Sequence, residues 1–248
     1  MNATIIQVTA RQVLGRRRTL LMLAGAALPI LIAVLYTFNN GGPDDPSPER
    51  FTANTLMGGL VTYLVLPIVA AVFGTAVLGA EIEEGTAVYL LSKPISRAQI
   101  VVSKLLVAWL ATVVVVVPAA AIAAVVALEG RDGDGISLAF AVALTAGSLA
   151  YSAFFVLLSI VTSRALIVGL LYAFIWEGVV TNLFDGTRLL SIREFTLSIA
   201  DALTSVRASA FEADLGPMQG VLLTAAVIVG ATAYASRRLE RFEIGETT

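Results

Sequence analysis

Residues 81–104, EIEEGTAVYLLSKPISRAQIVVSK, interrupt two long apolar runs with side chains that could bind a partner. The charged members of this stretch are Glu81, Glu83, Glu84, Lys93, Arg97 and Lys104. Between them lie Tyr89, Leu90 and Leu91. An apolar centre with a charged rim is the anatomy of a protein docking surface. The alternative is an ordinary loop whose leucines dip back into a membrane interface.

Catalytic chemistry finds little support elsewhere in the chain. The sequence has no His and no Cys, which excludes an HExxH zinc site, thiolate metal sites and a Ser-His pair. No Asp lies within an apolar run, so an intramembrane aspartyl dyad is also unsupported. Asp132 and Asp134 in GRDGDG lack the remaining ligands of a calcium loop. We expect no catalytic residue and no metal in this chain.

One carboxyl group does lie inside an apolar run, at Glu177. A charge at mid-bilayer costs roughly 2.5–3.5 kcal/mol, so Glu177 should face protein or water and have a partner. One interpretation is structural, with Glu177 hydrogen-bonded to the segment 184–216. The other is direct contact with a cationic substrate or a proton. Its neighbour Trp176 is more typical of an interfacial anchor.

The composition requires a membrane to hold these residues. The chain of 248 residues is 58% hydrophobic and 14% charged, against about 25% charged in soluble domains. A helix crosses a bilayer with about 20 apolar residues. We therefore expect one all-α membrane domain (1–248) with six transmembrane helices, at 19–38, 56–79, 104–128, 137–161, 165–183 and 217–236.

Arginines and lysines predict the orientation. With six spans, eleven of the 16 cations fall on the side that holds both termini and residues 81–104. We therefore expect cytoplasmic N and C termini. Residues 1–18, with Ile5, Ile6 and Val8 among polar neighbours, predict an interfacial N-terminal segment; a frayed terminus is the alternative.

The polar stretch has local signals for a helix, a turn and a second helix. Thr86 can cap a short helix through Leu91, and Pro94 ends it. Ser96 and Gln99 have the spacing of a capping box for the third span.

The segment 184–216 carries a second set of helix signals. Ser191 and Glu194 form a capping box, with Leu190 and Phe195 as its hydrophobic staple. Apolar residues then recur at helical spacing, namely Ile192, Phe195, Ile199, Leu203 and Val206. We expect amphipathic outer helices before the sixth span, lying flat on the membrane or dipping inward as a gate.

The run LGAEIEEGTAVYLLSKPISRAQIVVSKLL resembles the cytoplasmic coupling segment of type-2 ATP-binding-cassette (ABC) transporter permeases. The matching positions are Glu81, Glu83, Glu84, Gly85, Thr86, Leu90, Leu91, Pro94, Ser96 and Arg97. Tyr89 lies among them and would be the aromatic residue of the docking surface. The likeness extends to the span count, the Trp176-Glu177 pair and the mixed segment before the sixth span.

The resemblance implies a function and partners. Residues 81–103 would be the coupling segment that docks on a separate ABC ATPase subunit, and residues 184–216 an extracytoplasmic gate. Trp176, Glu177, Ser191, Glu194 and Phe195 would belong to the pathway or gate. The chain has no G-x-x-x-x-G-K-[ST] loop, so ATP and Mg would bind the partner.

We therefore expect a permease subunit that pairs with a second copy and two ATPase subunits. Its cargo would be a hydrophobic or amphipathic molecule exported across the plasma membrane of a prokaryotic cell. No nucleic-acid partner is expected. The alternative is a membrane channel or scaffold without nucleotide coupling.

Overall fold

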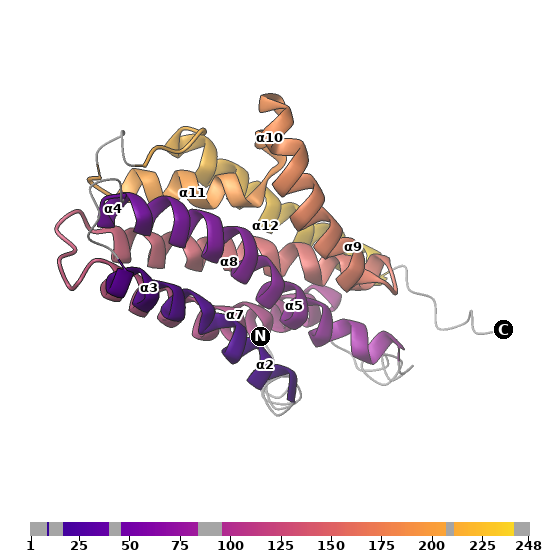
Figure 1. The fold of residues 1–248 in the computed structure, drawn as a ribbon. Coiled ribbons are helices and arrows are strands. Elements are labelled where there is room, and N and C mark those ends of the chain that lie inside the picture. The colour runs from indigo at the N-terminus through magenta and orange to yellow at the C-terminus, as the bar shows by residue number, and fades with distance from the viewer. Residues whose placement is uncertain (1–8, 10–16, 40–45, 84–95, 207–210, 241–248) are drawn as a thin grey trace.

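The computed structural model describes Thr9 and residues 17–39, 46–83, 96–206 and 211–240. The described residues form helices and connecting turns, without a strand (Figure 1). The elements are α2 (Arg17–Ala26), α3 (Leu28–Asn39), α4 (Pro48–Arg50), η1 (Phe51–Val65), α5 (Leu66–Glu83), α7 (Arg97–Ala127), α8 (Ile136–Val161), α9 (Ala165–Leu171), η2 (Tyr172–Val180), α10 (Thr181–Leu183), η3 (Asp185–Leu190), α11 (Ile192–Leu203) and α12 (Pro217–Glu240).

Six helices are long and apolar enough to cross a membrane, as the sequence predicts. Two of them begin earlier than the apolar runs indicate. The second spans Pro48–Gly79 and the third Arg97–Ala127. Both early starts have a serine cap: Ser47 Oγ accepts from the N–H of Arg50 at 3.3 Å, and Ser96 Oγ from that of Gln99 at 3.4 Å. Hydrophobicity alone therefore misplaced these starts, because capped polar turns extend each helix beyond its apolar part.

Prolines mark two of the places where a helix changes. Pro29 is the second residue of α3, after the break at Ala27, and Pro67 is the second residue of α5, where η1 ends. A proline lacks an N–H, so it is accommodated within a span where the helical hydrogen-bond pattern already changes. Pro118 differs, since α7 continues through it.

Two helical segments have the wider π-helical turn, η1 in the second span and η2 in the fifth. Runs of this kind are rare and often lie at functional sites. Here the two segments touch. The Tyr63 ring of η1 lies so close to Gly178 of η2 that an added Cβ would come within 2.2 Å of its hydroxyl. The Tyr63 and Phe174 rings meet edge to face, 5.9 Å apart.

Helix α8 is the centre of the bundle. It packs against α5, α7, α11 and α12. Small residues allow these close approaches: a Cβ on Gly74 of α5 would meet Phe155 of α8 at 2.7 Å, and a Cβ on Gly147 of α8 would meet Thr196 of α11 at 2.4 Å. Removing the Cβ lets two backbones approach, which favours helix association within membranes.

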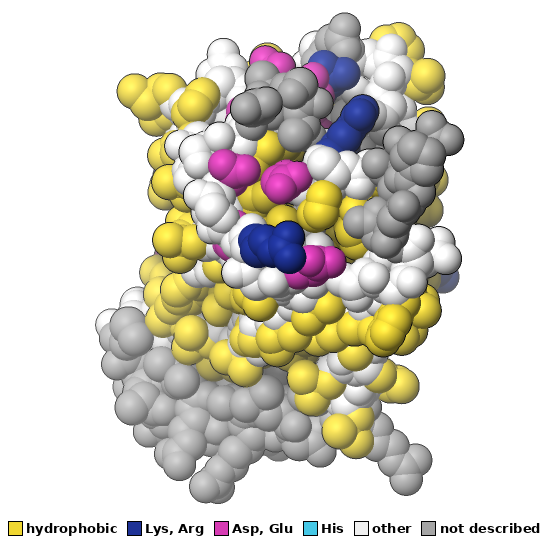
Figure 2. Space-filling view, turned by 60° about the vertical axis from the view of Figure 1, so that its left-hand side comes forward, with side chains coloured by type: hydrophobic (Ala, Val, Ile, Leu, Met, Phe, Trp, Pro, Cys, Tyr) yellow, Lys and Arg dark blue, Asp and Glu magenta, His cyan; other side chains and the backbone are white. Residues whose placement is uncertain are grey.

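One end of the bundle holds residues 46–50, 128–135, 184–206 and 211–216, and we call it the distal end. At the opposite, proximal end lie the last turn of α5, the first turn of α7 and the turn between α8 and α9 (Figure 1). Figure 2 shows the distal end, where acidic and basic side chains gather between apolar flanks.

Helix α11 lies at the distal end between α8 and α12. Its residues from Ile192 to Ala200 are buried, apart from the half-buried Arg193. The amphipathic pattern correctly placed Ile192, Phe195 and Ile199 in the interior. Leu203 was expected with them but is 53% exposed, and Val206 lies beyond the end of the helix. The helix stops at Leu203, so the last members of the pattern do not share its buried face.

The spans differ strongly in how much of their surface the chain itself covers. Over an 18-residue stretch of each span, 67% and 61% of the residues are buried in the second and fourth spans, but only 17% in the first and 22% in the fifth and sixth. The exposed residues of the fifth span include Ile167, Leu171, Ile175, Val179 and Leu183, each four residues after the last. Such a stripe on a membrane helix faces lipid or another chain.

Two glycines of α12 provide a matched test of the packing between α11 and α12. A Cβ on Gly220 would lie 2.6 Å from Ser198 Oγ and 3.1 Å from the backbone oxygen of Phe195, whereas one on Gly230 meets nothing within 4 Å. We expect Gly220→Ala to destabilise the protein by about 1–3 kcal/mol through overpacking. Gly230→Ala should leave the melting temperature in detergent unchanged or raise it. Equal melting temperatures for the two variants would contradict this packing.

Candidate functional site

The structure describes only the edges of the predicted coupling segment. Glu81 and Glu83 belong to the last turn of α5, Ser96 caps α7 and Arg97 is its first residue. The other residues predicted to bind an ATPase lie outside the described part of the chain, namely Glu84, Gly85, Thr86, Tyr89, Leu90, Leu91 and Pro94. Their docking role stays a prediction.

Among the described residues, Glu177 is a buried carboxyl group at the centre of a hydrogen-bond network. It lies in η2 of the fifth span and is 1% exposed. Tyr151 of α8 donates a hydrogen bond to its Oε2. Its Oε1 lies 3.2 Å from Ser191 Oγ, 3.2 Å from the backbone nitrogen of Arg193 and 3.1 Å from the Tyr172 hydroxyl. One carboxyl group thus joins the fourth span, the fifth span and the beginning of α11.

The start of α11 is built around this carboxyl group. Ser191 Oγ accepts from the N–H of Glu194 at 3.3 Å and donates to Glu177, so a single hydroxyl caps the helix and binds Glu177. The first N–H groups of a helix lack intrahelical partners and carry a partial positive charge. The N–H of Arg193 is one of these groups. Glu177 therefore satisfies a donor that the helix itself leaves free.

The predicted capping box at α11 is only half formed. Ser191 caps Glu194 as expected, but the Glu194 carboxylate pairs with Arg193 Nη1 at 2.9 Å. The N–H of Ser191, which that carboxylate was expected to bind, donates instead to the carbonyl oxygen of Arg188. Leu190, the expected staple, is 62% exposed. A charged partner next to Glu194 competes successfully with the backbone donor, because ion pairing strengthens a hydrogen bond.

Arg193 connects this site to the second span. Its guanidinium lies 5.7 Å from the centre of the Tyr63 ring, a cation–π arrangement. Burial raises the pKa of Glu194, and the Asp214 carboxylate adds to this rise, while Arg193 and Arg188 oppose it. Arg188 in turn pairs with Asp214 at 3.0 Å. Two basic and two acidic side chains, all outside the membrane spans, thus lie around the N-terminal turn of α11.

Trp176 and Phe195, the other two predicted gate residues, do not take part in this hydrogen-bond network. Phe195 is 2% exposed and packs in the apolar core. Trp176 Nε1 is buried and has no hydrogen-bond partner among the described residues. Because the two residues are adjacent on a helix, the Trp176 side chain points in a different direction from that of Glu177 and does not share its hydrogen bonds.

Sequence reasoning missed the tyrosines of the site. Tyr151 and Tyr172 bind Glu177, and Tyr63 stacks on Arg193. Tyr172 precedes Glu177 by five residues, a spacing that puts two residues on one face of a π-helix but not of an α-helix. Tyr151 is 26 residues away on another span. Only the hydroxyls themselves, polar groups inside apolar runs, could have signalled these roles.

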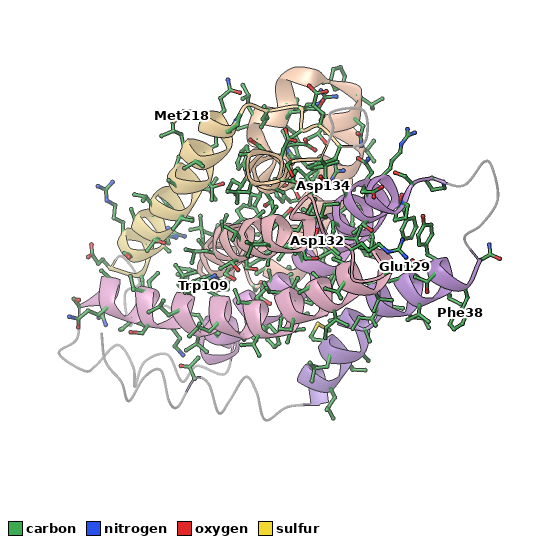
Figure 3. The ribbon with its side chains drawn as sticks, turned by 90° about the vertical axis from the view of Figure 1, so that its left-hand side faces the viewer. Phe38, Trp109, Glu129, Asp132, Asp134 and Met218 are labelled. Carbon is green, nitrogen blue, oxygen red and sulfur yellow. The ribbon has the colours of Figure 1, made fainter. Side chains whose placement is uncertain are left out.

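The distal loop between α7 and α8 caps α8 through the Asp132 side chain and binds the residues after α11 through the backbone of Asp134. Asp132 Oδ1 and Oδ2 accept from the N–H groups of Ile136 and Ser137 at 2.8 and 2.9 Å. The backbone oxygen of Asp134 accepts from the N–H of Ser205 and the Thr204 hydroxyl, both at 3.0 Å. Both aspartates lie on this distal loop, together with Glu129 (Figure 3). The loop therefore holds the far end of α11, as Glu177 holds its start.

A comparison with known families gives the class of the protein. The model of the ABC-2 family transporter proteins matches residues 14–182. This match covers more than half of the chain, so the chain belongs to that family, whose members are membrane subunits of ABC transporters. The matched region includes the predicted coupling segment and Glu177, but not α11 or α12. No curated protein matches the chain.

Two serine caps allow the Glu177 contact to be tested against capping alone. Ser96 and Ser191 cap α7 and α11 in the same way, but only Ser191 also donates to a buried carboxyl group. We expect Ser96→Ala to cost about 1 kcal/mol of stability. Ser191→Ala should cost about 1 kcal/mol more, because a buried acceptor loses a donor. Thermal unfolding of the purified variants measures the difference, and equal losses would show that the contact with Glu177 contributes nothing.

Proposed function

We propose that this chain is the permease subunit of an ATP-driven exporter, working as a dimer with two ABC ATPase subunits. The observation that carries the proposal is the family match over residues 14–182, which contains the coupling motif of residues 81–103. ATP and Mg would bind the partner subunits. The termini and the coupling segment would face the cytoplasm of a prokaryotic cell, and the distal end the outside of the plasma membrane.

The packing of the bundle supports a mechanical coupling. The coupling segment joins α5 to α7, and both helices pack along α8. Helix α8 carries Tyr151, which binds Glu177, and Gly147, which contacts Thr196 of α11. Close-packed interiors transmit displacement rather than absorb it. Movement of the coupling segment by an ATPase would therefore reach α11 at the distal end through rigid helices.

The uneven burial of the spans supports the pairing of two copies. The first, fifth and sixth spans leave most of their residues uncovered by the chain itself. A second permease would cover part of this surface, and lipid the remainder. A pathway between two such copies would be lined by Leu, Val and Ile side chains, which suits a hydrophobic or amphipathic cargo.

Substitution of the two coupling leucines tests the dependence on an ATPase. We expect that the double variant Leu90→Asp, Leu91→Asp no longer co-purifies with the ATPase subunit. The ATPase activity that the permease stimulates should fall at least about tenfold. The physical reason is that a carboxylate in an apolar docking surface must be desolvated on binding.

The matched control is Leu189→Asp, at a leucine of η3 that is 46% exposed at the distal end. It should leave co-purification with the ATPase unchanged, because it lies at the opposite end of the bundle from the predicted coupling segment. An ATPase that remains bound and stimulated by the double variant would refute the docking role. Purified protein that brings down no ATPase at all would favour a channel or scaffold.

A further inference from the structure

The polar contacts around Glu177 outnumber the protons that its neighbours can donate by one. Five contacts meet there: Tyr151 to Oε2, Ser191, Arg193 N–H and Tyr172 to Oε1, and Tyr172 to the backbone oxygen of Leu190. The donors other than Glu177 bring four protons, one each from Tyr151, Tyr172, Ser191 and the Arg193 amide. An ionised carboxylate accepts hydrogen bonds and donates none.

Tyr172 is where the count fails. Its hydroxyl lies 2.8 Å from the carbonyl oxygen of Leu190 and 3.1 Å from Glu177 Oε1, and a phenol has a single proton for these two acceptors. The Leu190 carbonyl has no proton to give. With the Tyr172 proton on the shorter contact, the second contact is a full two-centre hydrogen bond if Glu177 supplies the proton; with an ionised Glu177 the two acceptors share one proton in a weaker three-centre bond.

The electrostatic surroundings agree with this count. No cation forms an ion pair with Glu177 among the described residues, and Arg193, whose backbone N–H binds Glu177, has its guanidinium paired with Glu194. An isolated charge in an apolar span is costly, and a protonated carboxyl group avoids that cost. With the proton on Oε1, Oε2 keeps its full acceptor capacity for Tyr151, and Oε1 still has lone pairs, as a weaker acceptor, for Ser191 and the Arg193 amide.

We propose that Glu177 is a proton-binding site: in this conformation its carboxyl group is protonated and donates to the Tyr172 hydroxyl, which donates to the Leu190 carbonyl. The titratable and charged groups that face it are Tyr151 on α8, Tyr172 on η2, Arg193 and Glu194 on α11, and Tyr63 on η1 behind Arg193. The proton is the link between the fifth span and the segment that leads into α11. This site goes beyond the proposed transport function and does not depend on an ATPase partner.

The site has a direct spectroscopic test in the full chain, purified alone in lipid nanodiscs. Infrared spectra at neutral pH should contain a carbonyl-stretching band of a protonated carboxyl group that shifts in D₂O. Glu177→Gln should remove this band. Glu194→Gln, which changes the other buried carboxyl group of the site, should keep it. Absence of the band in the natural chain, or its persistence in Glu177→Gln, would overturn the proposal.

A second variant leaves the carboxyl group in place and so does not depend on how well Glu177→Gln folds. Tyr172→Phe removes the acceptor of the proposed proton but not the proton itself. The band should therefore shift in frequency rather than disappear. A band unchanged by Tyr172→Phe would show that the proton does not lie between Glu177 and Tyr172, and would refute the assignment. Tyr234→Phe, at an exposed tyrosine of α12, is the control and should leave the band as it is.

Discussion

The distal half of this protein depends on the satisfaction of one buried carboxyl group. Glu177 lies inside an apolar helix, where water cannot serve as its partner, so its hydrogen bonds must come from the protein. The groups that provide them belong to three different elements: Tyr151 to α8, Tyr172 to η2, and the Ser191–Arg193 turn to α11. Helix α11 is thereby held at its first turn, and the backbone oxygen of Asp134 holds its last. Polar contacts fix its two ends, and apolar burial fixes its length.

Close helix packing at glycines complements these polar contacts. Glycines at 74, 147, 178 and 220 lie where a neighbouring helix approaches too closely for a Cβ. All four of these contacts involve α11 or the second span, and each brings a short polar or aromatic side chain against bare backbone. Helices joined this closely move together, which would give the predicted coupling segment a mechanical route to the distal end. The exposed fifth span has two such glycines, Gly169 against Phe155 and Gly178 against Tyr63, and Glu177 adds a polar contact with Tyr151.

Much of the architecture was predictable because its causes are local. A bilayer requires about 20 apolar residues of each helix, so six runs gave six spans. Ser96 and Ser191 correctly placed the starts of α7 and α11, since a cap depends on neighbours three residues away. The start of the second span was wrong, because Ser47 and Pro48 continue the helix through polar residues that a hydrophobicity criterion discards. The Glu194 half of the capping box was wrong because Arg193, beside it, was the stronger partner.

The sequence by itself determined that Glu177 needs a partner, that a helix starts after Ser191, and that residues 81–103 resemble a coupling segment. These follow from residue type and short spacing. Only the tertiary structure decided that Tyr151 and Tyr172 surround Glu177 and that Tyr63 stacks on Arg193. Such pairs depend on how α8, η2 and η1 pack, and on a π-helical turn that changes which residues share a face. Neither the rotation of a helix nor its turn width can be read from an apolar run, because every side of such a run is compatible with burial.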